Sequence, residues 1–142
     1  MTRFDGKAWS APTLVHADGW KMPACPVNGP ALAAHGDAVV VAWYTAAGGT
    51  PSVQLARSDD AGAHFAAPVA VDRGEAVQGR VAVALDAAQA WVLWVREDAG
   101  GQSLQLARYA PDLSRRLAQV EVAKLQGRGT ATCASLRDRS GA

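Results

Sequence analysis

The sequence has little that would direct the chain to a membrane or to nucleic acid. Its 142 residues carry 14 basic and 13 acidic side chains, a formal net charge of +1, whereas phosphate binding needs clustered Lys and Arg. Its apolar runs, such as residues 38–43, are far too short to cross a bilayer. Residues 1–6 lack the apolar core of a signal peptide. We therefore expect no nucleic-acid partner, no membrane segment and no export signal in the chain as given.

Cysteine and recognisable ligand motifs are also scarce. The two cysteines, Cys25 and Cys133, lie far apart in the sequence; they can form one disulfide or remain two thiols, which is the commoner arrangement. Zinc-ligand spacing, a phosphate-binding loop and a dinucleotide fingerprint are all missing. We therefore expect no metal and no cofactor.

What the sequence does contain is an apolar fraction of 49%, enough for a hydrophobic core, and an internal repeat. Shifting the chain by 51 residues places residues 29–58 over residues 80–109, with ten of 30 positions identical. The identities include Trp43 with Trp94 and the run Gln-Leu-Ala-Arg, which occurs at residues 54–57 and again at 105–108. Such self-similarity indicates repeated structural units.

Each copy predicts four short strands separated by turn residues. They span residues 31–34, 38–44, 52–58 and 67–71 in the first copy, and 81–85, 90–96, 103–109 and 119–123 in the second. Four antiparallel strands in about fifty residues, repeated with a period, are typical of propeller blades. The predicted fold is therefore all-β, a β-propeller of four-stranded antiparallel blades with about two and a half blades in an incomplete ring. A β-sandwich is the alternative, but it does not predict the period.

The loop after the third strand of the first copy, residues 58–65, has the spacing S-x-D-x-G-x-x-F of an Asp-box. Ser58 and Asp60 are expected to bind the backbone of their own loop, Gly62 to adopt a positive φ, and Phe65 to anchor the loop between strands. His64 completes a Ser/His/Asp set, but one tight turn is an unusual place for a catalytic triad. We therefore interpret this loop as structural.

A weaker copy of the box precedes the first blade. Gly6, Trp9, Pro12 and Val15 align at a constant offset of 56 residues with Gly62, Phe65, Pro68 and Val71. This alignment predicts that residues 9–15 form the fourth strand of a preceding blade. In the second copy, residues 109–115 supply neither the glycine nor the aromatic of the box.

Together the repeat and the box resemble the Asp-box (BNR repeat) proteins of the sialidase-like superfamily. Residues 19–30, followed by the apolar strand at 39–43, resemble bacterial exo-α-sialidase-like proteins, and the likeness covers about residues 2–130. The resemblance implies a glycan ligand and a secreted or periplasmic parent protein.

The predicted organisation divides the chain into four parts. Residues 1–18 hold the outer strand of a preceding blade and the start of its connecting loop, 19–72 the first blade, 73–125 the second, and 126–142 the start of a third blade and a tail without strand-like alternation. Two blades leave apolar faces uncovered. We therefore expect either that the chain is truncated or that two or three copies associate to complete a ring.

In a propeller, the loops opposite the Asp-boxes build the ligand face. The candidate ligand residues on these loops are Arg80, Arg128, Trp20, Lys21, Asn28 and Glu75. A guanidinium at Arg80 or Arg128 can grip a sugar carboxylate with paired N–H donors, although bonding to blade-edge carbonyls is the commoner role. Trp20 can stack on a sugar or seal the blade interface.

A sialidase-like reaction needs three arginines, a tyrosine nucleophile with a glutamate, and an acidic catalyst. The sequence does not assemble this set, and Tyr44 is expected to be a core or interface residue, so no catalytic residue is assigned. The function implied by the resemblance is a glycan-directed propeller whose parent is a glycoside hydrolase, with this chain inactive alone. The alternative is a non-catalytic propeller module that binds glycan or protein.

Overall fold

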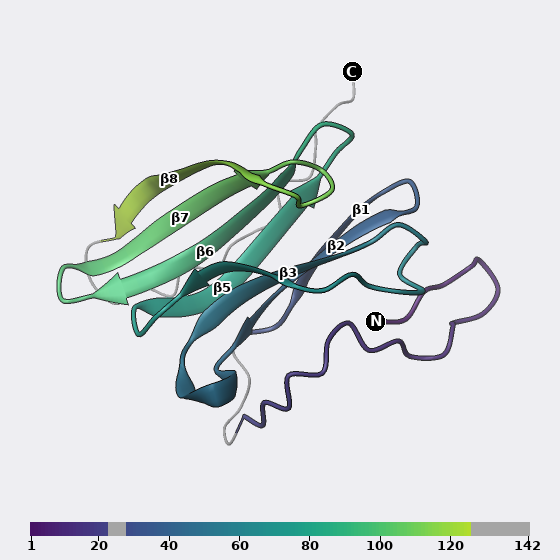
Figure 1. Ribbon diagram of the computed structural model, residues 1–142, viewed down its shortest axis with the longest axis horizontal. Helices are drawn as coiled ribbons and strands as arrows, with labels where there is room; N and C mark the ends of the chain where they lie inside the picture. Colours follow the sequence, from purple (N-terminus) through teal and green to yellow (C-terminus); the bar gives the residue numbers. More distant parts are fainter. Residues whose placement is uncertain (23–27, 126–142) are drawn as a thin grey trace.

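Eight segments with alternating or continuous apolar residues form eight β-strands in residues 1–22 and 28–125, the part of the chain that the computed structural model describes (Figure 1). The strands are β1 (Ala31–His35), β2 (Ala38–Thr45), β3 (Ser52–Ser58), β4 (Val69–Arg73), β5 (Val77–Leu85), β6 (Ala90–Asp98), β7 (Gly101–Tyr109) and β8 (Arg116–Leu125). A short 3-10 turn, η1 (Ala47–Gly49), lies between β2 and β3. Cys25, Cys133 and the predicted third blade at 126–142 lie outside the described residues.

The strands form two four-stranded antiparallel sheets in chain order, β1-β2-β3-β4 and β5-β6-β7-β8. The all-β prediction and the grouping of strands in fours are confirmed. The predicted bounds were less accurate for the fourth strands and for β5, which begins at Val77, four residues before its predicted start. The described residues contain two separate sheets and no closed ring.

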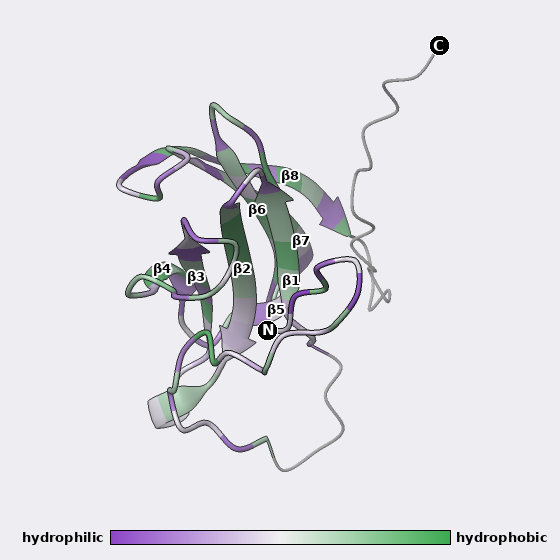
Figure 2. Ribbon diagram, turned by 90° about the vertical axis from the view of Figure 1, so that its right-hand side faces the viewer, coloured by the Kyte–Doolittle hydropathy of each residue, from purple (hydrophilic) through white to green (hydrophobic). Residues whose placement is uncertain are grey.

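The two sheets pack face to face, so that alternate side chains of each strand meet in one core. The first sheet contributes Val40, Ala42, Val53, Leu55 and Val71; the second contributes Val77, Ala90, Val92, Trp94, Ala107, Tyr109 and Leu113. Strands β2 and β6 are coloured as largely hydrophobic in Figure 2. The core therefore lies between the sheets, and each sheet has a second face that points away from it.

One buried carboxylate joins the sheets near the ends of their strands. Asp72 in β4 is only 12% exposed and accepts a hydrogen bond of 2.7 Å from the indole Nε1 of Trp94 in β6. The guanidinium of Arg96 reaches the same carboxylate at 3.1 Å. Because a buried indole N–H needs an acceptor and a buried carboxylate needs donors, these three side chains fix the register of one sheet on the other.

The strand predicted for residues 9–15 is wrong. Residues 1–13 fold back on themselves, with one isolated bridge between Phe4 and Trp9 and with Thr13 N bonded to Met1 O at 2.8 Å. A strand needs a neighbour for its backbone donors and acceptors, and within the described residues this segment finds only itself. The part that follows lies on the outer face of the first sheet, where His16 contacts the ring of Trp43.

A glycine lets the sheets approach each other at the start of β5. The ladder between β5 and β6 is irregular here, with Gly79 and Arg80 at φ values of 77° and 53°. The Tyr44 ring of the first sheet lies directly on Gly79, where an added Cβ would fall 2.8 Å from Tyr44 Cβ. Only glycine meets both demands, the positive φ and the close contact.

We predict that Gly79→Ala destabilises the protein more than Gly36→Ala. Both glycines have positive φ, so each substitution costs about 1–2 kcal/mol of backbone strain. Only Gly79 has a neighbour within reach of the new methyl group, which adds about 1–3 kcal/mol of overpacking. Urea unfolding followed by tryptophan fluorescence measures both variants, and equal losses would show that the Tyr44 contact is unimportant.

Candidate functional site

The connections between strands gather at two opposite ends of the paired sheets. One end, here called the loop end, holds the β2–β3, β4–β5 and β6–β7 connections and residues 16–22. These connections are tied to one another by Gly74 N to Pro51 O at 2.9 Å and by Glu97 N to Ala76 O at 2.7 Å. The other end holds the Asp-box, whose Ala61 N bonds to Asp37 O at 2.8 Å. The connections at the loop end therefore lie opposite the box.

The Asp-box has the predicted internal bonding. Ser58 Oγ accepts hydrogen bonds from Gly62 N at 2.8 Å and Asp60 N at 3.3 Å, and it donates to Asp60 Oδ1 at 2.7 Å. Asp60 also accepts from His64 N at 2.9 Å, and Gly62 has a φ of 85°. Phe65 is partly buried and its ring lies 3.8 Å from the Cβ position of Gly62. The box closes the turn between β3 and β4.

The Asp-box loop contains the residue types of a catalytic triad but not its geometry. The residues are Ser58, Asp60 and His64. Ser58 is 2% exposed and its hydroxyl donates to Asp60, so it offers no accessible nucleophile. The His64 ring is 89% exposed and binds Asp60 at 2.6 Å rather than Ser58. A triad instead places the histidine between the nucleophile and the acid.

The candidate ligand residue Asn28 has a structural role near β5. The Asn28 side chain donates to Gln78 O at 2.9 Å and accepts from Arg80 N at 3.2 Å, which fastens the long first loop to the β5 bulge. Arg80 is half-buried at that bulge. The amide nitrogen and the amide oxygen of Asn28 are therefore both hydrogen-bonded to backbone groups. Sequence spacing alone did not indicate this role.

Trp20 packs edge-on against Tyr44, with ring centroids 5.6 Å apart. Because Tyr44 also covers Gly79, the two rings seal the junction between the sheets at the loop end. Trp20 therefore has the interface role that is one of its two expected roles. Tyr44 belongs to the packing between the two sheets. Lys21 and Glu75 are exposed on the same loops, and Arg128 lies outside the described residues.

The structure reveals a polar cavity at the loop end that the sequence analysis did not assemble. Its volume is about 140 Å³. The lining consists of His16, Asp18, Thr45, Ala47, Thr50, Ser52, Gln54, Pro68 and Arg73. Three connections at the loop end contribute to it, and Asp18 and Arg73 stand 55 positions apart in the chain. Only the folded structure brings the two charges to one cavity.

The carboxylate in this cavity is held ionised. Hydrogen bonds from the Thr45 hydroxyl, the Trp20 backbone N–H and the Trp43 indole lower the pKa of Asp18 below its ordinary value. The residues that line the cavity therefore include the acid Asp18, the base Arg73, the hydroxyl residues Thr45, Thr50 and Ser52, and the amide Gln54. Such a mixture of short hydrogen-bonding groups suits a ligand with several hydroxyls and one charged group.

Other kinds of site find less support. Among residues 1–22 and 28–125, no group of three or more His, Cys, Asp or Glu side chains is arranged to hold a metal ion. In the same part of the chain, no helix has the length and apolarity to cross a membrane.

No protein-family model, curated protein or solved structure matches this chain.

The Asp-box makes stability sensitive to acid. The backbone and side-chain hydrogen bonds from His64, with the bond from Ser58, hold the pKa of Asp60 well below its ordinary value. Because its pKa is lower in the folded state, the ionised carboxylate stabilises the native state at pH values above the unfolded pKa of about 3.9. This stabilisation is lost progressively as the pH falls below that value towards the folded-state pKa. We predict that Asp60→Asn lowers the melting temperature at pH 7 and reduces its further fall between pH 5 and about pH 2.

The matched control is Asp37→Asn, which removes one carboxylate from the neighbouring turn. Melting temperatures of both variants, measured by circular dichroism across the pH series, check the prediction. An Asp60→Asn variant with the wild-type acid profile would mean that the Asp60 hydrogen bonds do not stabilise the turn.

Proposed function

We propose that this chain forms part of an Asp-box β-propeller of the sialidase-like kind, directed at glycans. Three features support the proposal. Four-stranded antiparallel sheets repeat with a period of 51 residues, they pack face to face, and the turn between β3 and β4 has the bonding that an Asp-box requires. Propellers are built from blades of this form.

The ligand we propose is a sugar that carries a carboxylate, bound in the polar cavity at the loop end. The single observation that carries this proposal is the pairing of Arg73 with neutral hydrogen-bonding groups in one small cavity opposite the Asp-box. A guanidinium binds a carboxylate with charge-assisted hydrogen bonds. Hydroxyl and amide side chains, with the Asp18 carboxylate, match the hydroxyl groups of a sugar ring.

The geometry favours binding over hydrolysis by this chain. Tyr44 is the tyrosine considered as a nucleophile, and its ring is engaged by Trp20 and Gly79 in the packing between the sheets. A tyrosine held in this way is not presented to a ligand in the cavity. The proposed activity of the chain itself is therefore recognition of the glycan. Binding of a protein instead of a glycan is the competing function.

Binding of N-acetylneuraminic acid, measured by isothermal titration calorimetry, tests the proposal. We predict that Arg73→Gln weakens the affinity about tenfold or more, because one charge-assisted hydrogen bond contributes about 1.5–3 kcal/mol. Galactose has no carboxylate, so its affinity is expected to be lower than that of the acidic sugar and unaffected by the substitution.

The matched control is Arg115→Gln, which removes an exposed arginine from the β7–β8 loop at the opposite end. It is expected to bind as the wild type does. Undetectable binding of the acidic sugar by the wild type, or equal binding by Arg73→Gln and wild type, would contradict the proposed site. A release of free sugar from a sialoside by the chain alone would contradict the assignment of a binding role.

A further inference from the structure

The second sheet has an apolar face that points away from the core. By the alternation of side chains along its strands, this face is opposite the one that carries Val92, Trp94 and Ala107 into the core. Here it is called the open face, and it consists of Trp91, Leu93, Leu104, Leu106 and Val120, with Leu93 paired to Leu106 and Leu106 to Val120. Val120 is 51% exposed, and the other four members are partly exposed. A continuous apolar surface of this kind indicates an interaction site.

The 51-residue repeat shows what kind of surface the open face is. Each of its members is the counterpart of a residue on the core-facing side of the first sheet: Val40 for Trp91, Ala42 for Leu93, Val53 for Leu104, Leu55 for Leu106 and Val69 for Val120. In the first sheet these positions are covered by the second sheet. The open face of the second sheet is therefore equivalent in the repeat to the core-facing side of the first sheet, which packs against the second sheet.

The complementary surface also has a counterpart in the same chain. The second sheet meets the first with Val83, Val92, Trp94, Gln105 and Ala107. The outer face of the first sheet carries their counterparts, Leu32, Val41, Trp43, Gln54 and Ala56, of which the last four are identical in type. The chain therefore holds both halves of one interface, on the second face of each sheet.

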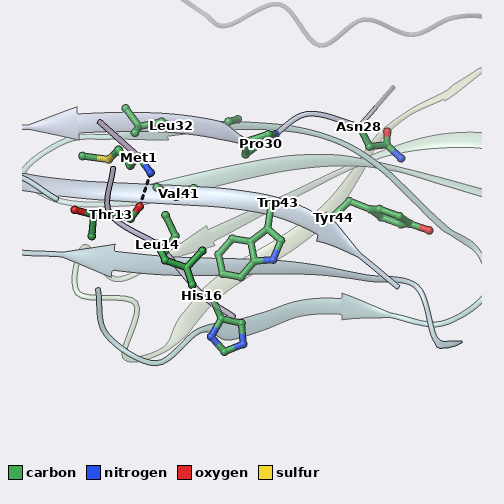
Figure 3. Close-up of a pocket in the computed structure, with 12 residues that line it drawn as sticks. Met1, Thr13, Leu14, His16, Asn28, Pro30, Leu32, Val41, Trp43 and Tyr44 are labelled. Carbon is green, nitrogen blue, oxygen red and sulfur yellow. Dashed lines mark hydrogen bonds between the residues drawn. The ribbon is translucent and has the colours of Figure 1, made fainter. Parts of the chain in front are cut away.

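The outer face of the first sheet is only loosely covered. A groove of about 440 Å³ runs over Val41 and Trp43, between the sheet and residues 13–16 of the N-terminal segment (Figure 3). Leu32 of the sheet and Leu14 of the N-terminal segment both line the groove, and they are 52% and 73% exposed. Val41 is 5% exposed and Trp43 is partly buried on this face, whereas their counterparts Val92 and Trp94 are fully buried under the first sheet. The N-terminal segment thus fills the face less well than a sheet does.

A carboxylate is already in place for such an interface. Between the two sheets, Asp72 accepts the indole N–H of Trp94. On the outer face, Asp18 accepts the backbone N–H of Trp20, and the nearby Trp43 indole is among the groups that lower the pKa of Asp18. In the first sheet, Asp72 of β4 is paired with Val53 of β3. The equivalent position in the second sheet is Ala123 of β8, which is paired with Leu104 of β7. If a second sheet packed on this outer face, it would place the small Ala123 side chain near Trp43, where Asp18 already provides a carboxylate.

We propose that copies of this chain associate head to tail, with the open face of the second sheet of one copy packed on the outer face of the first sheet of the next. Residues 1–14 would be displaced, while Asp18 stays on Trp43. A head-to-tail contact uses two different surfaces, so it produces a ring or a filament. Closed propellers have four to eight blades, so rings of two to four copies are the expected products.

Complementary variants test the arrangement. Val120→Glu places a charge on the open face, and Leu32→Glu places one on the outer face; both positions are about half exposed, so the fold of each monomer should tolerate them. Light scattering coupled to size exclusion should give a discrete oligomer of two to four copies for the wild type. Each variant alone should associate at least tenfold more weakly. An equimolar mixture of the two should form a one-to-one dimer, because one intact face of each kind remains.

Ala87→Glu, in the exposed β5–β6 turn, adds the same charge away from both faces and should assemble as the wild type does. A monomeric wild type would overturn the proposal. So would an oligomer that Val120→Glu dissociates and Leu32→Glu leaves intact, because that result indicates two open faces packed on each other. Polydisperse aggregation that neither variant relieves would overturn it as well.

Discussion

The burial of one face of each sheet against the other is the interaction on which the rest of the structure depends. A four-stranded sheet has two faces and gains little by itself, whereas each Val, Leu or Trp buried between the sheets contributes about 1.5–3 kcal/mol. Trp94, Leu55 and Val40 are fully buried there. Everything at the loop end, from the Trp20–Tyr44 contact to the Asn28 bonds, is positioned by this packing.

Two tryptophans at equivalent positions of the repeat show how polar groups enter such an interface. The indole N–H of Trp94 donates to Asp72 at 2.7 Å, and the Trp43 indole is among the groups that lower the pKa of Asp18; in both cases the aspartate comes from the preceding segment of the chain. An indole buried without an acceptor would lose a hydrogen bond that water had supplied. A tryptophan and an aspartate therefore lie together on both covered faces, and the Trp94–Asp72 hydrogen bond links the two sheets.

The two ends of the sheets are built for different purposes. At the Asp-box end, Ser58 and Asp60 satisfy backbone N–H groups of their own turn, which leaves that turn closed and its hydroxyl buried. At the loop end, longer connections from separate parts of the chain meet around the polar cavity. Loops held by a rigid scaffold are where binding residues usually lie, and the division of roles between the ends is consistent with that rule.

The sequence by itself determined the strands, their grouping in fours and the closure of the Asp-box turn, because each of these depends on residues close together in the chain. The 51-residue repeat places Trp43 and Trp94 on equivalent strands, and the spacing of Ser58, Asp60 and Gly62 is sufficient for their local bonds. Alternation and turn chemistry act over a few residues, so they can be read without knowing the fold.

Only the tertiary structure decided which of the candidate residues are occupied by structural contacts and which line a cavity. Asn28 reaches Arg80, Tyr44 lies on Gly79, and Asp18 shares a cavity with Arg73, each across tens of residues in the sequence. The predicted strand at residues 9–15 failed for the same reason. Its residues have the composition of a strand, but whether a strand forms depends on a partner strand, and the packing of the molecule determines which segments become neighbours.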